Sequence, residues 1–141
     1  MDAFDADVLI YAAEDGHPLG RRINALFQGH VAAGDPSAGV GSVLLLPEVM
    51  SKSLDPGRHD EAAKLSVLLG QLDLQQVDTP TADKATTFRS DYGLKTVDAV
   101  HLATAVQAGA DRFITNNRRE FSAAIEEIEI VFPEDLPDPK G

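Results

Sequence analysis

The sequence contains no cysteine. Disulfide bonds, thiolate metal sites and cysteine nucleophiles are therefore excluded, and the composition is compatible with the cytoplasm. The chain also has no apolar run close to the roughly 20 residues that span a bilayer. Its first residues lack the basic-then-apolar order of a signal peptide. We therefore expect a cytoplasmic protein with no membrane partner.

Positive charge is scarce as well. Lys and Arg number 12 against 23 Asp and Glu, which gives a formal net charge of −11. This balance argues against a general nucleic-acid coat protein. It is compatible with an enzyme that meets phosphate groups through metal ions, and with a basic protein partner attracted to the acidic surface.

Apolar periodicity and turn residues predict strands that alternate with helices. The expected strands are 38–46, 74–77, 113–115 and 128–132, and the expected helices are 18–32, 47 to about 55, 58–72, 79–92, 96–108 and 118–124. Thr79 or Thr81 is expected to cap the helix that ends at Gly93, and Thr96 the next helix. Such alternation predicts an α/β fold, with a mainly parallel sheet of about four to five strands and helices on both faces.

The chain is expected to form one domain over residues 1–132, because 141 residues are enough to bury a single core. Residues 133–141 are acidic and rich in proline. We expect this tail to be loose, as chain ends commonly are.

Two carboxylates stand within apolar runs, where an ionised group is costly unless something pairs with it. They are Asp5 and Asp98. With Glu48 between them and Asn117 after them, they predict an acidic metal pocket, because parallel sheets gather their sites at the carboxyl ends of the strands. Local pattern alone would instead draw the first strand through residues 8–11, with Asp5 at its start, and the run is too short for periodicity to decide.

The candidate site residues lie within a series of short sequence segments whose order and spacing are informative. They are Phe4-Asp5-Ala6-Asp7-Val8-Leu9-Ile10-Tyr11-Ala12, His17-Pro18, Pro47-Glu48-Val49, the stretch from Tyr92 to Ala105 that contains Thr96-Val97-Asp98-Ala99-Val100-His101-Leu102-Ala103, and Phe113-Ile114-Thr115-Asn116-Asn117. In this order and spacing, over roughly residues 2–131, the chain resembles a PIN domain. Within that class it is similar to the VapC-type ribonuclease toxins of bacterial toxin–antitoxin pairs.

The resemblance implies a three-layer α/β sandwich in which the first strand lies near residues 2–5 and ends at the first acidic residue. It also implies Mg²⁺- or Mn²⁺-dependent cleavage of RNA by three or four acidic residues. Asp5, Glu48 and Asp98 match the first three. Asn117 stands where the family usually has a fourth aspartate, so that position supplies an oxygen ligand without charge. An antitoxin partner with a basic segment is a further expectation. The apolar helices around 44–54 and 58–72 offer a surface for a homodimer or for the antitoxin.

Supporting roles are expected for two further residues. The Thr115 hydroxyl is predicted to lie near a ligand or a phosphate, and Glu120, about one turn into the helix 118–124, is predicted to compensate for Asn117. For His101 we favour burial with one hydrogen bond over a role as a base. Arg118 and Arg119 fit either a phosphate contact or a solvated helix start.

Each acidic residue also has a structural reading. Asp5 fits a strand-end cap, and Asp98 fits a favourable first-turn charge on its helix. Two other functions stay open. Asp5 and Asp7 resemble the nucleophile motif of haloacid dehalogenase-type phosphatases, although the paired acids that the family needs later are missing from Thr115-Asn116-Asn117. Asn117 also permits a degenerate, non-catalytic binding module.

Overall fold

A computed structural model describes residues 1–51, 54–55 and 57–139 of the chain. Its centre is a sheet of five strands in which every pairing is parallel, in the order β3-β2-β1-β4-β5. The strands are β1 (Asp2–Phe4), β2 (Gly39–Ser42), β3 (Leu72–Gln75), β4 (Arg112–Ile114) and β5 (Glu129–Val131). The predicted α/β class and parallel sheet are confirmed.

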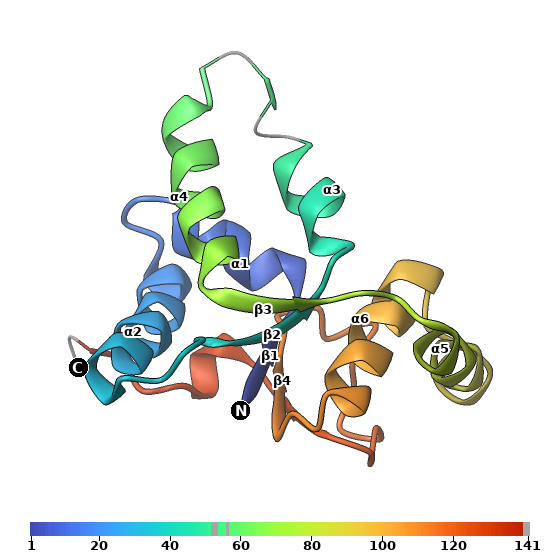
Figure 1. The fold of residues 1–141 in the computed structure, drawn as a ribbon. Coiled ribbons are helices and arrows are strands. Elements are labelled where there is room, and N and C mark those ends of the chain that lie inside the picture. Colours follow the sequence, from blue (N-terminus) through green and yellow to red (C-terminus); the bar gives the residue numbers. More distant parts are fainter. Residues whose placement is uncertain (52–53, 56, 140–141) are drawn as a thin grey trace.

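Helices cover both faces of the sheet, as Figure 1 shows. The helices on one face are α1 (Ala6–Ala13), α2 (Pro18–Ala33), α3 (Leu45–Met50) and α4 (His59–Gly70), and those on the other are α5 (Thr79–Tyr92) and α6 (Thr96–Gln107). The chain runs outward from β1 through β2 to β3 and then returns across β1 to β4. Because crossovers between parallel strands are right-handed, this reversal moves the later helices to the opposite face.

Neighbouring residues of the central strands enter two separate cores. Ala3 and Phe113 pack with α5 and α6, whereas Phe4 and Ile114 pack with the helices of the first face. Successive side chains of a strand point to opposite faces, so each strand of three residues serves both layers.

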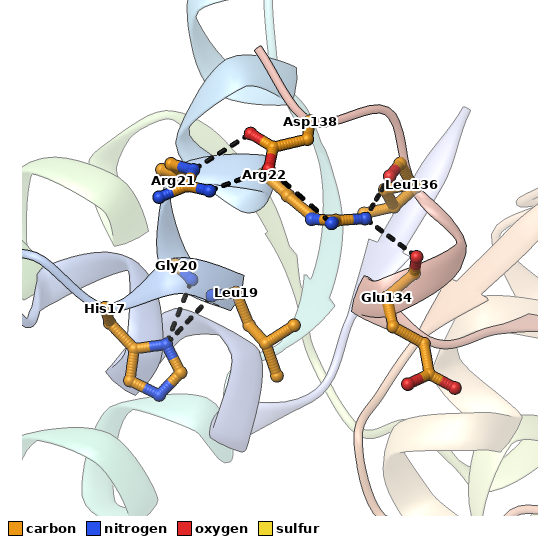
Figure 2. Close-up of polar contacts among 8 residues, drawn as sticks. All are labelled: His17, Leu19, Gly20, Arg21, Arg22, Glu134, Leu136 and Asp138. Atoms are coloured by element: carbon orange, nitrogen blue, oxygen red, sulfur yellow. Dashed lines mark hydrogen bonds and ion pairs between the residues drawn. The ribbon is translucent and has the colours of Figure 1, made fainter. Parts of the chain in front are cut away.

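The α1–α2 pair depends on a close backbone approach. A Cβ built on Gly20 would lie 2.1 Å from the carbonyl oxygen of Tyr11. Only glycine allows α2 to pack at this depth. His17 precedes Pro18 at the start of α2, and its Nδ1 accepts hydrogen bonds from the amides of Leu19 and Gly20 (Figure 2).

Several element boundaries differ from the sequence prediction. The strand expected over 38–46 ends at Ser42, because the chain turns and α3 begins at Leu45, two residues before Pro47. That helix ends at Met50; the predicted end near residue 55 adjoins Pro56, which lies outside the described residues. Strand β3, predicted to begin at Leu74, begins at Leu72.

Two caps and one helix were predicted wrongly. Asp78, and neither threonine, caps α5 by accepting a hydrogen bond from the amide of Thr81. Lys95 occupies the cap position of α6, without a side-chain bond. Residues 118–124 form turns instead of a helix. The Ser122 hydroxyl accepts a hydrogen bond from the amide of Ala124, which offers the backbone an alternative to helical bonding.

The expectation of a loose tail is wrong for residues 133–139. Leu136 is 3 % exposed and belongs to the core of the first face. Figure 2 shows Arg21 binding the Asp138 carboxylate through two nitrogens, at 2.9 and 2.7 Å, while Arg22 donates to the carbonyls of Glu134 and Leu136. The acidity of the tail suggested that it is solvated. Instead, the Asp138 carboxylate and the carbonyls of Glu134 and Leu136 accept hydrogen bonds from the two arginines of α2.

No described helix combines the length and the apolar character that crossing a bilayer would require.

Candidate active site

The predicted site residues lie on four segments that meet at the carboxyl ends of the strands. Asp5 follows β1 directly, and Thr115 to Asn117 follow β4. Glu48 lies on α3, which follows β2, and Asp98 lies in the first turn of α6. The strand near residues 2–5 is confirmed, so residues 8–11 belong to α1.

Asp5 is held from both sides. Its Oδ1 accepts a hydrogen bond from the amide of Ala6 at 2.8 Å, which caps α1, and its Oδ2 accepts one from the Thr115 hydroxyl at 2.8 Å. The Thr115 hydroxyl oxygen in turn accepts a bond from the amide of Asn117. Asp5 is only 4 % exposed, and this burial raises the pKa of its carboxyl against the opposing effects of His101 and Thr115. Asp5 is therefore a helix cap and a buried acid at once.

The carboxyl groups of Asp98 and Asp7 also have raised pKa values. Burial, followed by repulsion from Asp5, Glu120 and Glu48, raises the pKa of Asp98 to about 6. Burial and repulsion from Asp5 raise the pKa of Asp7 to about 7. The Oδ1 atom of Asp7 is buried and has no hydrogen-bond partner within the described part of the chain. Asp5 is thus close enough to repel Asp7 and Asp98, and the opposing effect of His101 does not cancel the rise in the pKa of Asp5 or of Asp98.

Glu48 reaches the pocket from the opposite helical layer. Its Oε2 lies 2.6 Å from Nε2 of His101, one turn after Asp98 on α6. The expectation that His101 is buried with a single hydrogen bond is confirmed, since its side chain is 1 % exposed and its Nδ1 has no partner among the described residues.

Asn117 and Glu120 stand at the rim. The Asn117 Oδ1 accepts a long hydrogen bond of 3.3 Å from the amide of Glu120, and the Glu120 carboxylate accepts one of 3.1 Å from the amide of Lys95. Glu120 therefore fastens the turn after β4 to the start of α6. It is near enough to raise the pKa of Asp98, although the residue lies in a turn and not in the predicted helix.

The donor set fits a hard divalent cation in kind and in charge. Carboxylate and amide oxygens are the ligands that Mg²⁺ takes in proteins, and a cation would offset the repulsion that raises the pKa values of Asp5, Asp7 and Asp98. Across residues 1–51, 54–55 and 57–139, however, no three His, Asp or Glu side chains are placed as ready-made ligands. The His101 ring engages one oxygen of Glu48 and leaves the other available, while the Ala6 amide and the Thr115 hydroxyl each engage one oxygen of Asp5.

The sequence analysis named Asp5, Glu48, Asp98 and Asn117 as site residues but gave no role to Lys95. Its position three residues before Asp98, at the start of the same helix, was the available signal. Of the two arginines it considered, Arg118 lies 3.9 Å over the ring of Phe132 and pairs with Glu134, whereas Arg119 is exposed.

Comparisons with known proteins agree with this fold. The sequence model of the PIN domain matches residues 3–126. No curated protein matches the chain significantly. Among solved structures, a toxin–antitoxin complex from Klebsiella pneumoniae matches with a TM-score of 0.70 at 23 % identity, over 94 % of this chain and 98 % of that one.

Two further structures share the fold. DNA-bound VapBC from Salmonella typhimurium matches with a TM-score of 0.73 at 18 % identity, over 94 % of this chain and 97 % of that one. The Mycobacterium tuberculosis toxin VapC20, described as cleaving the sarcin–ricin loop, matches with a TM-score of 0.57 at 14 % identity, over 80 % and 87 % of the two chains. Since the family's sequence model covers nearly the whole chain, the protein belongs to the PIN domain family.

Proposed function

We propose that this protein is a metal-dependent endoribonuclease and the toxin of a toxin–antitoxin pair. The observation that carries the proposal is the meeting of Asp5, Glu48 and Asp98 at the strand ends of a PIN domain, with the pKa values of Asp5 and Asp98 raised by burial and mutual repulsion. A protein keeps such an arrangement at a cost in stability, and a cation with a phosphate substrate would use it.

In the proposed mechanism, Asp5 and Asp98 are the primary ligands of Mg²⁺ or Mn²⁺, and Asn117 adds a neutral oxygen. The bound ion would lower the pKa of a water molecule and offset charge on the phosphate. Thr115 fixes the Asp5 carboxylate by its 2.8 Å hydrogen bond, and Glu48 would bind a second ion or orient the attacking water. Water adds to phosphorus and the 3′ oxygen leaves, so the products carry a 5′-phosphate and a 3′-hydroxyl.

Two cations beside the pocket support RNA as the substrate. In the described part of the chain, the other Lys and Arg side chains contact carboxylates, carbonyls, a hydroxyl or aromatic rings. Lys95 and Arg119 are exposed and have no such partner among those residues. The hydrogen bond from the Lys95 amide to Glu120, the neighbour of Arg119, brings the two segments together. Among the described residues of this protein of net charge −11, these are the cations available to an incoming phosphate chain.

The proposed partner is an antitoxin with a basic segment. Two of the structures that share this fold are described as VapBC bound to DNA, and a third as a toxin–antitoxin complex. The net charge of −11 favours a basic partner through long-range attraction. Exposed Leu46, Leu54 and Val67 on and near α3 and α4 would contribute to a surface for the antitoxin or for a homodimer.

The test is cleavage of a labelled RNA by the purified protein in Mg²⁺ or Mn²⁺, with and without chelator. Asp5→Asn and Asp98→Asn should each lower the rate by at least about 100-fold, because each removes charge that the transition state needs. Asp83→Asn, an exposed aspartate of α5, is the matched control and should leave the rate unchanged. Equal cleavage by all four proteins, or cleavage that survives the chelator, would contradict the proposal.

The two other functions fare differently. Membership of the PIN family removes the basis for a haloacid dehalogenase-type phosphatase, which rested on Asp5 and Asp7 alone. A non-catalytic binding module is the outcome if the protein binds no Mn²⁺ at millimolar concentration and cleaves no RNA.

A further inference from the structure

Among residues 1–51, 54–55 and 57–139, the His101 side chain has a single polar partner, and that partner is a predicted site residue. Its Nε2 lies 2.6 Å from Oε2 of Glu48, 53 positions away in the sequence. The two residues come from α6 and α3, which cover opposite faces of the sheet. The contact therefore joins the two helical layers above the strand ends, and Asp98 lies one turn before His101 on the same helix.

The direction of the hydrogen bond follows from the chemistry of the two groups. An ionised carboxylate only accepts, so Nε2 of His101 carries the hydrogen and donates it. The ring is 1 % exposed, and its Nδ1 has no partner among the described residues. A buried polar ring costs free energy that an apolar side chain of similar size would avoid. Its bond to Glu48 is the one compensation for that cost in the described structure.

Glu48 needs such a restraint. Its charge raises the pKa values of Asp5, Asp7 and Asp98, so these carboxyls and Glu48 repel one another. Its side chain is 36 % exposed, which leaves it a route away from them into water. The hydrogen bond to His101 engages one carboxylate oxygen and opposes that movement, and the other oxygen stays available.

We propose that His101 is a positioning residue that holds Glu48 beside Asp5 and Asp98 for metal binding. The inference rests on the proposed function, since it assigns Glu48 to the metal site. Hydrogen-bond partners of metal ligands typically change metal affinity by about 10–100-fold. Because Asp98 and His101 share one turn of α6, this helix would set the positions of both acids.

The experiment is Mn²⁺ titration by calorimetry of the whole protein and three variants. His101→Leu removes the donor and should weaken Mn²⁺ binding by about tenfold. His101→Gln returns an amide N–H near the position of Nε2 and should bind within about threefold of the parent protein. A double variant, His101→Leu with Glu48→Ala, should bind as Glu48→Ala does, because His101 acts only through Glu48. Thermal unfolding of each variant establishes that it is folded.

The outcomes separate this inference from the proposed function. If the parent protein binds no Mn²⁺, both fail. If it binds and His101→Leu binds equally well or better, the positioning role is wrong while the metal site stands. A loss in His101→Leu that persists in the Glu48→Ala background, or that His101→Gln does not restore, shows that His101 acts through packing and also overturns the proposal.

Discussion

Acidic residues do opposite things at two places in this molecule. In the C-terminal tail, Asp138 lies 2.7 Å from Arg21 and 3.6 Å from Arg22, and the tail is fixed on α2 (Figure 2). In the candidate active site, burial raises the pKa values of Asp5, Asp7 and Asp98, and the Asp5 carboxylate raises those of Asp7 and Asp98 further. In the tail, ion pairs between Asp138 and the two arginines stabilise the position of the chain on α2. The candidate site holds like charges together, which is the pattern of a site prepared for a cation.

The strongest test of the tail's structural role is Leu136→Ala. This side chain is 3 % exposed in the core of the first face, and truncating such a leucine typically costs about 3 kcal/mol of unfolding free energy. Leu54→Ala is the matched control, because that leucine is 83 % exposed and its loss should change stability by less than about 0.5 kcal/mol. Urea unfolding measures both. Equal stability of the two variants would mean that the tail contributes nothing to the fold.

Asn117→Asp should sharpen the charge imbalance at the active site. The new carboxylate adds a charged ligand, so the Mn²⁺ concentration for half-maximal RNA cleavage should fall by about tenfold. Gln28→Glu is the control, because it adds the same charge at an exposed amide residue of α2, away from the site. An unchanged metal requirement in Asn117→Asp, or the same fall in both variants, would show that residue 117 does not meet the ion.

Asp98→Asn should stabilise the metal-free protein at neutral pH. The pKa of Asp98 is raised from 3.8 to about 6, so between these values the folded state binds more protons than the unfolded state. The unfolding free energy therefore falls as pH rises through this window, and asparagine removes the loss. Because Asp98 is only half-buried, we expect a gain on the order of 1 kcal/mol at pH 7.5, and none below pH 3.8.

Thermal unfolding at the two pH values, without metal, measures this gain. Asp83→Asn is again the matched control, and its exposed side chain should leave the melting temperature nearly unchanged at both. Asp98→Asn that destabilises the protein at pH 7.5 would show that its helix-start role outweighs the repulsion.

The smallest effect is expected for the two exposed cations near the candidate site, Lys95 and Arg119. Lys95→Gln and Arg119→Gln should each raise the KM for RNA a few-fold at low salt. Each should also reduce the slope of log affinity against log salt concentration by about 0.7, the value of one phosphate contact on a single strand. Arg58→Gln, whose arginine pairs with Glu61 on α4, is the control. Salt slopes that match the parent protein would exclude both residues from the RNA path.

The sequence predicted most helices because their periodicity and turn residues are local. It could not place β1 by pattern, since the strand has three residues and the apolar run that follows it is the buried helix α1. Only the resemblance resolved that choice. The wrong helix over 118–124 has a local cause too, because Ser122 bonds the backbone there.

The remaining features that the sequence analysis did not predict depend on contacts between residues far apart in the sequence. The docked tail depends on bonds between Arg21 and Asp138, 117 positions apart, and a single leucine among acids gave no sign of burial. The residues of the candidate site were predictable as a set. The partner of Glu48 was not, because a hydrogen bond across 53 positions leaves no periodic trace.

The order of strands in the sheet has a consequence for biosynthesis. β1 is made first, yet it pairs with β4, whose residues follow more than a hundred positions later. A growing chain that has not reached Ile114 leaves one edge of β1 open and lacks the hydroxyl that fixes Asp5. The acidic pocket therefore cannot assemble before Thr115 has left the ribosome, and shorter nascent chains carry no complete site.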